Sequence, residues 1–210
     1  MISLLAVVAV GALSAPEPKN LRDWFTRENA AEQFDRGLKL DQIYAVRFSL
    51  IVDPQGRVRE CRIGQSSGIG GLDARTCELV RRRARFHPAR KADGTAVHGV
   101  YRTSTQYYMT ERKGSTPNAI QPDLIVAVAK LPAGEKSPVA VRIVFHVDAK
   151  GSVAQCERVS PESNAALVRV ACDQFLSSPS LPPVRTGAGE AVESIQLATV
   201  AFLEDSPAPR

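Results

Sequence analysis

The chain has 210 residues, of which 44% are hydrophobic and 23% are charged, with 14 glycines and 14 prolines. This composition is that of a globular protein, and it excludes a coiled coil, a collagen-like chain and a wholly disordered one. The net charge of +5 permits an anionic partner without requiring one. The length allows one large domain or two of about 100 residues. Four cysteines and three histidines are too few for an elaborate metal site, so we expect neither a metal nor another cofactor.

The N-terminal residues 1–15 form a short apolar segment, MISLLAVVAVGALSA. As a helix, its apolar run from Leu4 to Leu13 would span roughly 15–20 Å, whereas a bilayer core needs about 30 Å. The length therefore favours a cleaved secretory signal, with Ala12 and Ser14 at the −3 and −1 positions of the cleavage site. No Lys or Arg precedes the run, and a buried N-terminal strand or helix is the alternative. An exported chain could oxidise its cysteines.

An internal repeat organises the rest of the chain. VRFSLIVDPQGRVREC at 46–61 matches VRIVFHVDAKGSVAQC at 141–156, at an offset of 95 residues that includes all four cysteines. Matches at one constant offset predict a tandem duplication. The polar, turn-rich stretch between the copies predicts a linker. The expected segments are the N-terminal segment 1–15, a first domain at 20–109, the linker at 110–122, a second domain at 123–204 and a tail at 205–210.

Each copy predicts the same order of elements. A strand at Val46–Val52, an Asp-Pro-Gln-Gly turn and a second strand form a hairpin, which the second copy repeats from Val141 to about Val159. A helix and a third strand follow, and Ser163 or Asn164 is expected to cap the second helix. The expected helices are about Leu72–Arg85 and Ala165–Ser177, the third strands are Val97–Tyr108 and Val192–Leu203, and a further helix is expected within Asn20–Arg36.

The expected fold class is α+β: two tandem ββαβ domains, each a small antiparallel sheet with one packed helix and one disulfide. In each copy one cysteine ends the second strand and the other lies on the helix, 16 residues further on. Closing such a loop stabilises a domain by roughly 3 kcal/mol. In an exported protein we therefore expect disulfides formed by Cys61 with Cys77 and by Cys156 with Cys172. Reduced core cysteines are the alternative, and this spacing without a pair of histidines does not suit zinc.

The residues Gly64–Gly68 read GQSSG and match the G-x-S-x-G motif of serine hydrolases between a strand and a helix. A hydrolase also needs a base, an acid and a large, mostly parallel sheet. The second copy replaces the motif with SPESN. We therefore interpret the segment as a helix-entry loop and expect no enzyme. His146 lies in the middle of a predicted strand and is interpreted as a structural histidine.

A basic cluster lies late in the first helix and comprises Arg81, Arg82, Arg83 and Arg85. Positive side chains there complement the helix dipole. A solvated helix face is one interpretation of the cluster, and binding to anionic lipid or to a cell-wall polymer is the sharper one. The second copy lacks these arginines.

The stretch Val46–Tyr108 resembles the C-terminal domain of TonB-type energy transducers. The cysteine-containing form, with CRIGQSSG and LDARTC, is similar to TonB-family proteins of alphaproteobacteria. The second copy follows only through the internal repeat and lacks the SSG and LD matches. The matching residues are VRFSLIVDPQGRV at 46–58, SSG at 66–68, LD at 72–73, RARFHPA at 83–89, Gly94 and Val97.

The resemblance implies a periplasmic, non-catalytic interaction domain that engages an extended segment of an outer-membrane transporter by strand addition. The expected partner-binding edge is the third strand, Val97–Tyr108, in which Tyr101, Thr103, Thr105 and Tyr107 share one face. The alternatives are that this strand only covers the core, or that the two copies pair edge to edge. We expect a protein partner and no nucleic acid, and peripheral association with the envelope stays open.

A force-transmitting transducer needs a membrane anchor and a proline-rich spacer. The apolar N-terminal run is too short for a good anchor, and the 14 prolines are scattered. We therefore expect an accessory binding protein in envelope transport. A transducer anchored in the inner membrane by an uncleaved segment 1–15 is the alternative, and a cell-wall or anionic-surface binder is the second alternative.

Overall fold

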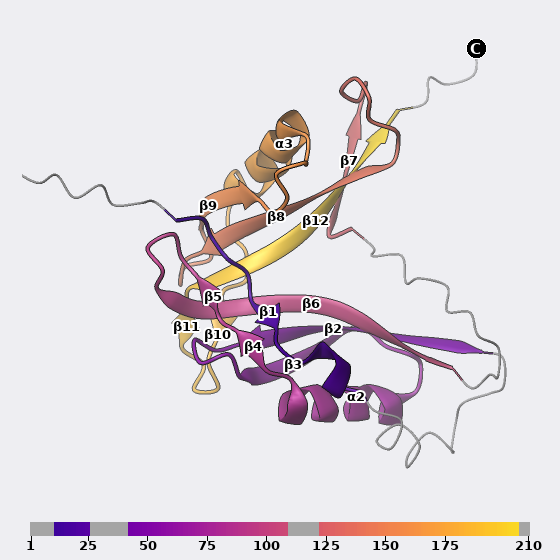
Figure 1. The fold of residues 1–210 in the computed structure, drawn as a ribbon, viewed down its shortest axis with the longest axis vertical. Coiled ribbons are helices and arrows are strands. Elements are labelled where there is room, and N and C mark those ends of the chain that lie inside the picture. The colour runs from indigo at the N-terminus through magenta and orange to yellow at the C-terminus, as the bar shows by residue number, and fades with distance from the viewer. Residues whose placement is uncertain (1–10, 26–41, 109–121, 206–210) are drawn as a thin grey trace, which may run out of the picture.

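The computed structural model of the chain describes residues 11–25, 42–108 and 122–205 (Figure 1). Residues 11–25 and 42–108 form the N-terminal half, and residues 122–205 form the C-terminal half. Six strands run in the order β3-β2-β6-β12-β8-β9 through one sheet, and β5 and β7 pair with β6 and β12. The N-terminal half contains β1 (Glu17–Pro18), the 3₁₀ helix η1 (Leu21–Asp23), β2 (Ile43–Val52), β3 (Val58–Gln65), α2 (Gly70–Arg83), β4 (Phe86–His87), β5 (Ala89–Arg90) and β6 (Ala96–Tyr108). The C-terminal half contains β7 (Leu124–Val128), β8 (Val139–Val147), β9 (Val153–Arg158), α3 (Ala165–Leu176), β10 (Val184–Arg185), β11 (Ala191–Val192) and β12 (Ser194–Glu204).

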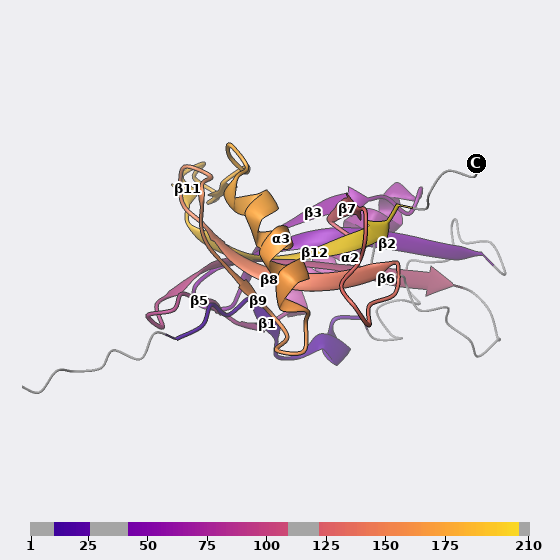
Figure 2. The same ribbon diagram turned by 90° about the horizontal axis from the view of Figure 1, so that it is seen from above.

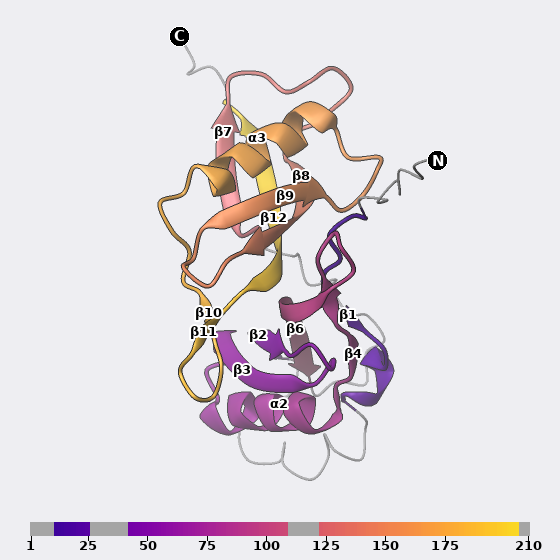
Figure 3. The same ribbon diagram turned by 90° about the vertical axis from the view of Figure 1, so that its left-hand side faces the viewer.

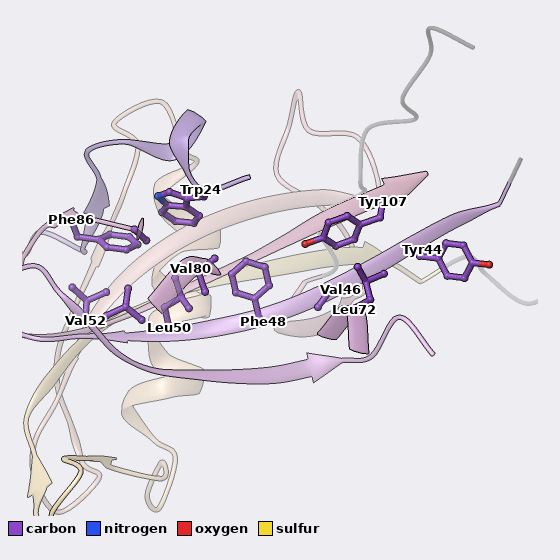
Figure 4. Close-up of a cluster of buried hydrophobic side chains, with 12 residues drawn as sticks. Trp24, Tyr44, Val46, Phe48, Leu50, Val52, Leu72, Val80, Phe86 and Tyr107 are labelled. Atoms are coloured by element: carbon purple, nitrogen blue, oxygen red, sulfur yellow. The ribbon is translucent and has the colours of Figure 1, made fainter. Parts of the chain in front are cut away.

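The N-terminal half has the predicted ββαβ order. Every second side chain of β2 is buried on the face that α2 covers, because a strand has a period of two. Gly56 closes the β2–β3 turn with φ +78, and a Cβ there would lie 2.0 Å from the carbonyl oxygen of Phe86. The turn therefore requires glycine. The β2 side chains in this core are Tyr44, Val46, Phe48, Leu50 and Val52, drawn with Trp24 and Phe86 in Figure 4.

Helix α2 begins and ends slightly earlier than the predicted Leu72–Arg85. At its C-terminal end, the Asn20 side chain donates to the carbonyl oxygen of Arg83 (3.0 Å) and accepts from the backbone N–H of Arg85 (2.9 Å). Ala84, between these two residues, is already extended. A residue from outside the repeat therefore ends this helix.

The C-terminal half repeats this order with β8, β9, α3 and β12. The disulfides Cys61–Cys77 and Cys156–Cys172 are both present, each between a second strand and a helix and each with a sequence separation of 16. The two predicted disulfides and the mixed α+β fold are thus confirmed. Asn164 caps α3 by accepting from the backbone N–H of Ala166 at 3.0 Å.

Strand β7 is an addition that the sequence did not predict. It lies parallel to β12, with Leu124–Val128 in register with Val200–Glu204 (Figures 1 and 2). Strand β12 is consequently flanked by β8 on one side and by β6 and then β7 on the other. The third strand of the C-terminal half is therefore enclosed by strands of its own chain.

The two halves meet where β6 and β12 pair in parallel. His98, Gly99 and Val100 are in register with Ser194, Ile195 and Gln196. Val100 lies on the face of β6 opposite α2, whereas Gln196 lies on the same face of β12 as the core residues Ala198 and Val200 beneath α3. Paired neighbours in a sheet point to the same side. The two helices therefore cover opposite faces of the sheet, and Figure 3 shows them at opposite ends of the molecule.

Each half covers part of the sheet face that the other half's helix leaves bare. Val184 and Val192 of β10 and β11 pack on Ile51 and Val100 in the N-terminal half. Reciprocally, Ala89 and Val97 of the N-terminal half pack on Val144 and Ile195 of the C-terminal half. The pairs 184/192 and 89/97 are related by the 95-residue offset of the repeat. The exchange of apolar contacts is thus reciprocal.

The N-terminal segment is packed into the fold from Gly11 onward. It runs antiparallel to residues 85–92, with backbone hydrogen bonds from Gly11 to Ala92 and between Ser14 and Arg90. Leu13 is 6% exposed and lies in the apolar cluster between the halves. This arrangement matches the buried-strand alternative, and cleavage after Ser14 stays a prediction. In the described part of the chain, no helix is both long enough and apolar enough to span a bilayer.

Two sequence predictions fall largely outside the described residues. The helix expected within Asn20–Arg36 is described only to residue 25, where the 3₁₀ helix η1 is present. The linker expected at 110–122 lies outside the described ranges except for Pro122.

Candidate partner-binding groove

A groove opens where β6 and β12 diverge beyond their three paired residues. It has a volume of about 480 Å³. Both strands contribute to its walls, and so do β2 and β8, which flank them. We call it the β6–β12 groove. Its lining includes Arg47, Tyr101, Arg102, Thr103, Arg142 and Leu197.

Arg102 closes the end of the groove at which the two strands separate. Its guanidinium donates to the carbonyl oxygen of Leu197 (2.8 Å) and to the side-chain oxygen of Gln196 (3.0 Å). Burial lowers the pKa of Arg102, and the Asp123 carboxylate, 4.0 Å from its Nε, acts in the opposite direction. Arg102 thus supplies a hydrogen-bond donor to β12 just beyond the last residue that pairs with β6.

The groove carries more positive than negative charge. Arg47, Arg102 and Arg142 line it, together with one carboxylate, that of Asp123. Neither Arg47 nor Arg142 forms an ion pair with another described residue. Their guanidinium groups can therefore donate to carbonyl or carboxylate oxygens of a bound segment.

The four side chains predicted to form the partner-binding face do share one face of β6, and that face is the one α2 covers. Tyr107 is 8% exposed, and its hydroxyl lies 2.7 Å from that of Thr76. Burial raises the pKa of Tyr107, and the Thr76 hydrogen bond acts in the opposite direction. Tyr107 is part of the core rather than of an open aromatic pocket. Thr103 lines the groove, and Thr105 is half-buried further along the strand.

Tyr101 has two environments. Its ring packs on those of Trp24 and Phe86, with centroids 5.9 and 5.1 Å away, and burial raises the pKa of its hydroxyl. It also lines the β6–β12 groove. Tyr101 and Thr103 are therefore the two predicted residues that the structure brings into the groove, and their role in partner binding stays a prediction.

Strand β6 shows the alternative arrangement in which the two copies pair edge to edge. The two halves pair edge to edge at 98–100 of β6. This pairing occupies the beginning of the strand that the sequence assigned to a partner. A segment bound from outside must therefore lie beyond residue 100, alongside the groove.

The G-x-S-x-G segment forms the entry to α2. The Ser66 hydroxyl donates to Asp73 at 2.5 Å, and the Ser67 hydroxyl and N–H donate to the same carboxylate at 2.7 and 3.0 Å. Burial alone would raise the pKa of Asp73, but these hydrogen bonds outweigh it and the pKa lies below its ordinary value. Both serines are thus committed to the first turn of the helix, as the helix-entry interpretation expects.

The basic cluster surrounds the C-terminal end of α2. Arg81, Arg82 and Arg85 are exposed, and Arg83 is half-buried. Arg82 lies 3.4 Å from Glu78 one turn earlier, and the Arg85 guanidinium donates to the carbonyl oxygens of Arg82 and Ala84. The guanidinium groups of Arg82 and Arg85 therefore have partners within the helix end, and that of Arg83 donates to the carbonyl oxygen of Asp23 (3.5 Å).

His146 lies at the seam between the halves. Its Nε2 is 2.9 Å from Glu193, whose carboxylate is also 3.2 Å from the ammonium group of Lys91. The Glu193 carboxylate therefore links His146, in its own C-terminal half, to Lys91 of the N-terminal half. Across the described ranges, no three His, Cys, Asp or Glu side chains gather closely enough to hold a metal ion.

Residues 45–109 match the family described as the Gram-negative bacterial TonB protein C-terminal. The match runs from the third residue of β2 to just beyond the end of β6, and so includes most of the hairpin, α2 and the third strand. It supports the TonB C-terminal family for this segment. No curated protein matches the chain. No solved structure matches it either.

Proposed function

We propose that this chain is a non-catalytic protein of the cell envelope that binds an extended segment of another protein in the β6–β12 groove. The observation that carries the proposal is the TonB C-terminal match over 45–109, because that family suggests a protein-interaction role. The groove supports it, since it runs along the third strand of the matched segment.

Strand addition is the mode of binding that we propose. An extended segment would lie beside β6 beyond residue 100 and gain main-chain hydrogen bonds, with side chains directed to both faces of the sheet. On one face they would meet Arg47, and on the other Tyr101 and Arg142. This arrangement suits a segment that carries a carboxylate among apolar residues.

The partner that we propose is an outer-membrane transporter, and the compartment is the periplasm. Proteins with TonB C-terminal domains belong to the envelope. The two disulfides support an oxidising compartment, because cytosolic thiols are kept reduced.

We also propose that the two halves arose by tandem duplication. The 95-residue offset, the common ββαβ order and the two disulfides of equal separation support this origin. The C-terminal half then diverged and lost the serines and the aspartate that begin α2.

The proposal is tested by photo-crosslinking in envelope fractions, with a photoreactive residue placed at Thr103 or at Leu197. A probe at Ala154, exposed on β9 and remote from the groove, is the matched control. We expect the two groove probes, and not the control, to crosslink to an extended segment of an outer-membrane transporter. Groove probes that react only within the chain itself would contradict the proposal.

A further inference from the structure

Strand β7 is a five-residue aliphatic segment, LIVAV, held against the third strand of the C-terminal half. Its side chains alternate between two environments. Leu124, Val126 and Val128 pack on the core beneath α3. Ile125 points the other way and is 58% exposed. The strand is thus half-buried on the edge of β12 rather than enclosed in the core.

Asp123 fixes the beginning of this strand through both its backbone and its side chain. Its backbone N–H donates to the carbonyl oxygen of Thr199 (2.8 Å), and its carboxylate accepts from the N–H of Thr199 (2.8 Å). At the other end, the N–H of Asp205 donates to the carbonyl oxygen of Val128 (2.9 Å). The sequence that this edge accepts is therefore an acidic residue followed by a run of aliphatic residues.

The edge that β7 occupies corresponds, by the 95-residue offset, to the part of β6 beyond its contact with β12. Thr199 to Glu204 correspond to residues 104–109. Arg142 likewise corresponds to Arg47. Arg47 is half-buried, Arg142 is exposed, and both line the β6–β12 groove. The C-terminal half therefore holds a segment of its own chain at the position where the N-terminal half is proposed to hold a partner.

We infer that β7 is an in-chain ligand, which occupies the partner-binding edge of the C-terminal half and closes that half to outside segments of the same chemistry. The inference rests on the proposed function, because it assigns to β12 the same strand recognition. The occupant that this edge fits is an extended segment that runs parallel to β12, with an Asp followed by a run of aliphatic residues.

The tether explains why this edge stays occupied. A segment joined to its site through the chain has an effective concentration in the millimolar range for short flexible connections. An outside segment of equal intrinsic affinity at micromolar concentration does not displace it. The C-terminal half should become available only when the docking of β7 is weakened.

The test uses a labelled peptide, PDLIVAVA (residues 122–129), and the full chain with its disulfides intact. Val126→Asp places a charge on the buried side of β7 and should release the strand. Ile125→Asp places the same charge on the exposed side and is the matched control. By fluorescence anisotropy, we expect Val126→Asp to bind the peptide at least tenfold more tightly than either the wild-type chain or Ile125→Asp. Equal binding by all three proteins, or none by a folded Val126→Asp variant, would overturn the inference.

A second peptide tests whether the Asp carboxylate that accepts from Thr199 contributes to binding. Replacing its Asp by Asn removes the negative charge of the group that accepts from Thr199, and we expect several-fold weaker binding to Val126→Asp. An unchanged affinity would contradict the assigned role of the carboxylate.

If Val126→Asp fails to fold, Asp123→Ala in the full chain provides an independent measurement. Hydrogen exchange at residues 124–128 should accelerate at least tenfold while β8 and β9 keep their protection. Unchanged exchange would overturn the inference. These experiments use the chain's own segment, so their failure is distinct from a failure of the groove probes at Thr103 and Leu197.

Discussion

The two halves share a ββαβ scaffold with a disulfide of identical spacing, yet they are completed by different segments. In the N-terminal half, residues 11–25 supply Asn20 to the end of α2 and Trp24 to the core. In the C-terminal half, β7 completes the edge of β12. The comparison teaches that the ββαβ unit is unfinished by itself, and that a different segment completes it in each half.

The two helices begin differently as well. Helix α2 starts from a buried carboxylate that accepts three hydrogen bonds from Ser66 and Ser67. Helix α3 has a single side-chain cap from Asn164. The N-terminal half therefore depends on an ionised group, and the C-terminal half on a neutral amide.

The largest expected effect comes from Trp24→Ala. The indole is fully buried against Phe86 and Tyr101, and removing a buried Trp costs about 3–5 kcal/mol. We expect hydrogen exchange to show lost protection in α2 and β6 while α3 and β8 retain theirs. Equal loss in both halves would show that the N-terminal segment stabilises the whole sheet.

The second largest effect is expected from removing either disulfide. Cys61→Ala with Cys77→Ala, and separately Cys156→Ala with Cys172→Ala, should each cost roughly 3 kcal/mol in the free energy of unfolding, because the two loops have equal length. Urea denaturation of the two double variants measures this. A large difference between them would show that the halves contribute unequally to the stability of the fold.

Asp73→Asn tests whether the start of α2, unlike that of α3, depends on a charged group. The variant keeps the shape of the side chain and removes its charge. We therefore expect the free energy of unfolding to fall by on the order of 1–3 kcal/mol at neutral pH. Because the pKa of Asp73 is lowered in the folded chain, its contribution is complete above the unfolded value of about 4 and disappears as the pH falls through the folded value. Urea denaturation at several pH values should therefore show the wild-type and variant stabilities converging in acid. A constant gap would contradict this role of the carboxylate.

The smallest effect is expected for Asn164→Ala. Loss of one N-cap costs about 1 kcal/mol, and the neutral amide gives no dependence on acidic pH. The same denaturation series provides the measurement, and it compares directly with Asp73→Asn. A pH-dependent loss would show that α3 also depends on a charged group.

The scaffold was predictable because its signals are local. Alternating apolar residues in Val46–Val52, the Asp-Pro-Gln-Gly turn and the repeated cysteine spacing indicate the hairpins, helices and disulfides directly. Strand β7 gives no such signal, since LIVAV is apolar throughout and has no period of two. Its partner β12 lies more than seventy residues away in the chain.

The site was only partly predictable for a related reason. Alternation along β6 shows that Tyr101 and Tyr107 share a face, but it does not show that α2 covers that face. Leu13 presents the same difficulty, because an apolar run has the same composition in a signal and in a buried strand. The short pairing of β6 with β12 depends on how the halves dock, which neither copy encodes alone.

Val184 and Val192 shield one half, and Ala89 and Val97 shield the other. This reciprocal packing limits which parts of the chain can be lost during evolution. A deletion that removed either half would leave the survivor with an uncovered apolar face and would remove the one parallel pairing between β6 and β12, with its three residue pairs. The two halves are therefore expected to be retained or lost together. Substitutions elsewhere on either half leave this mutual cover intact, as long as the small apolar residues Ala89, Val97, Val184 and Val192 are preserved.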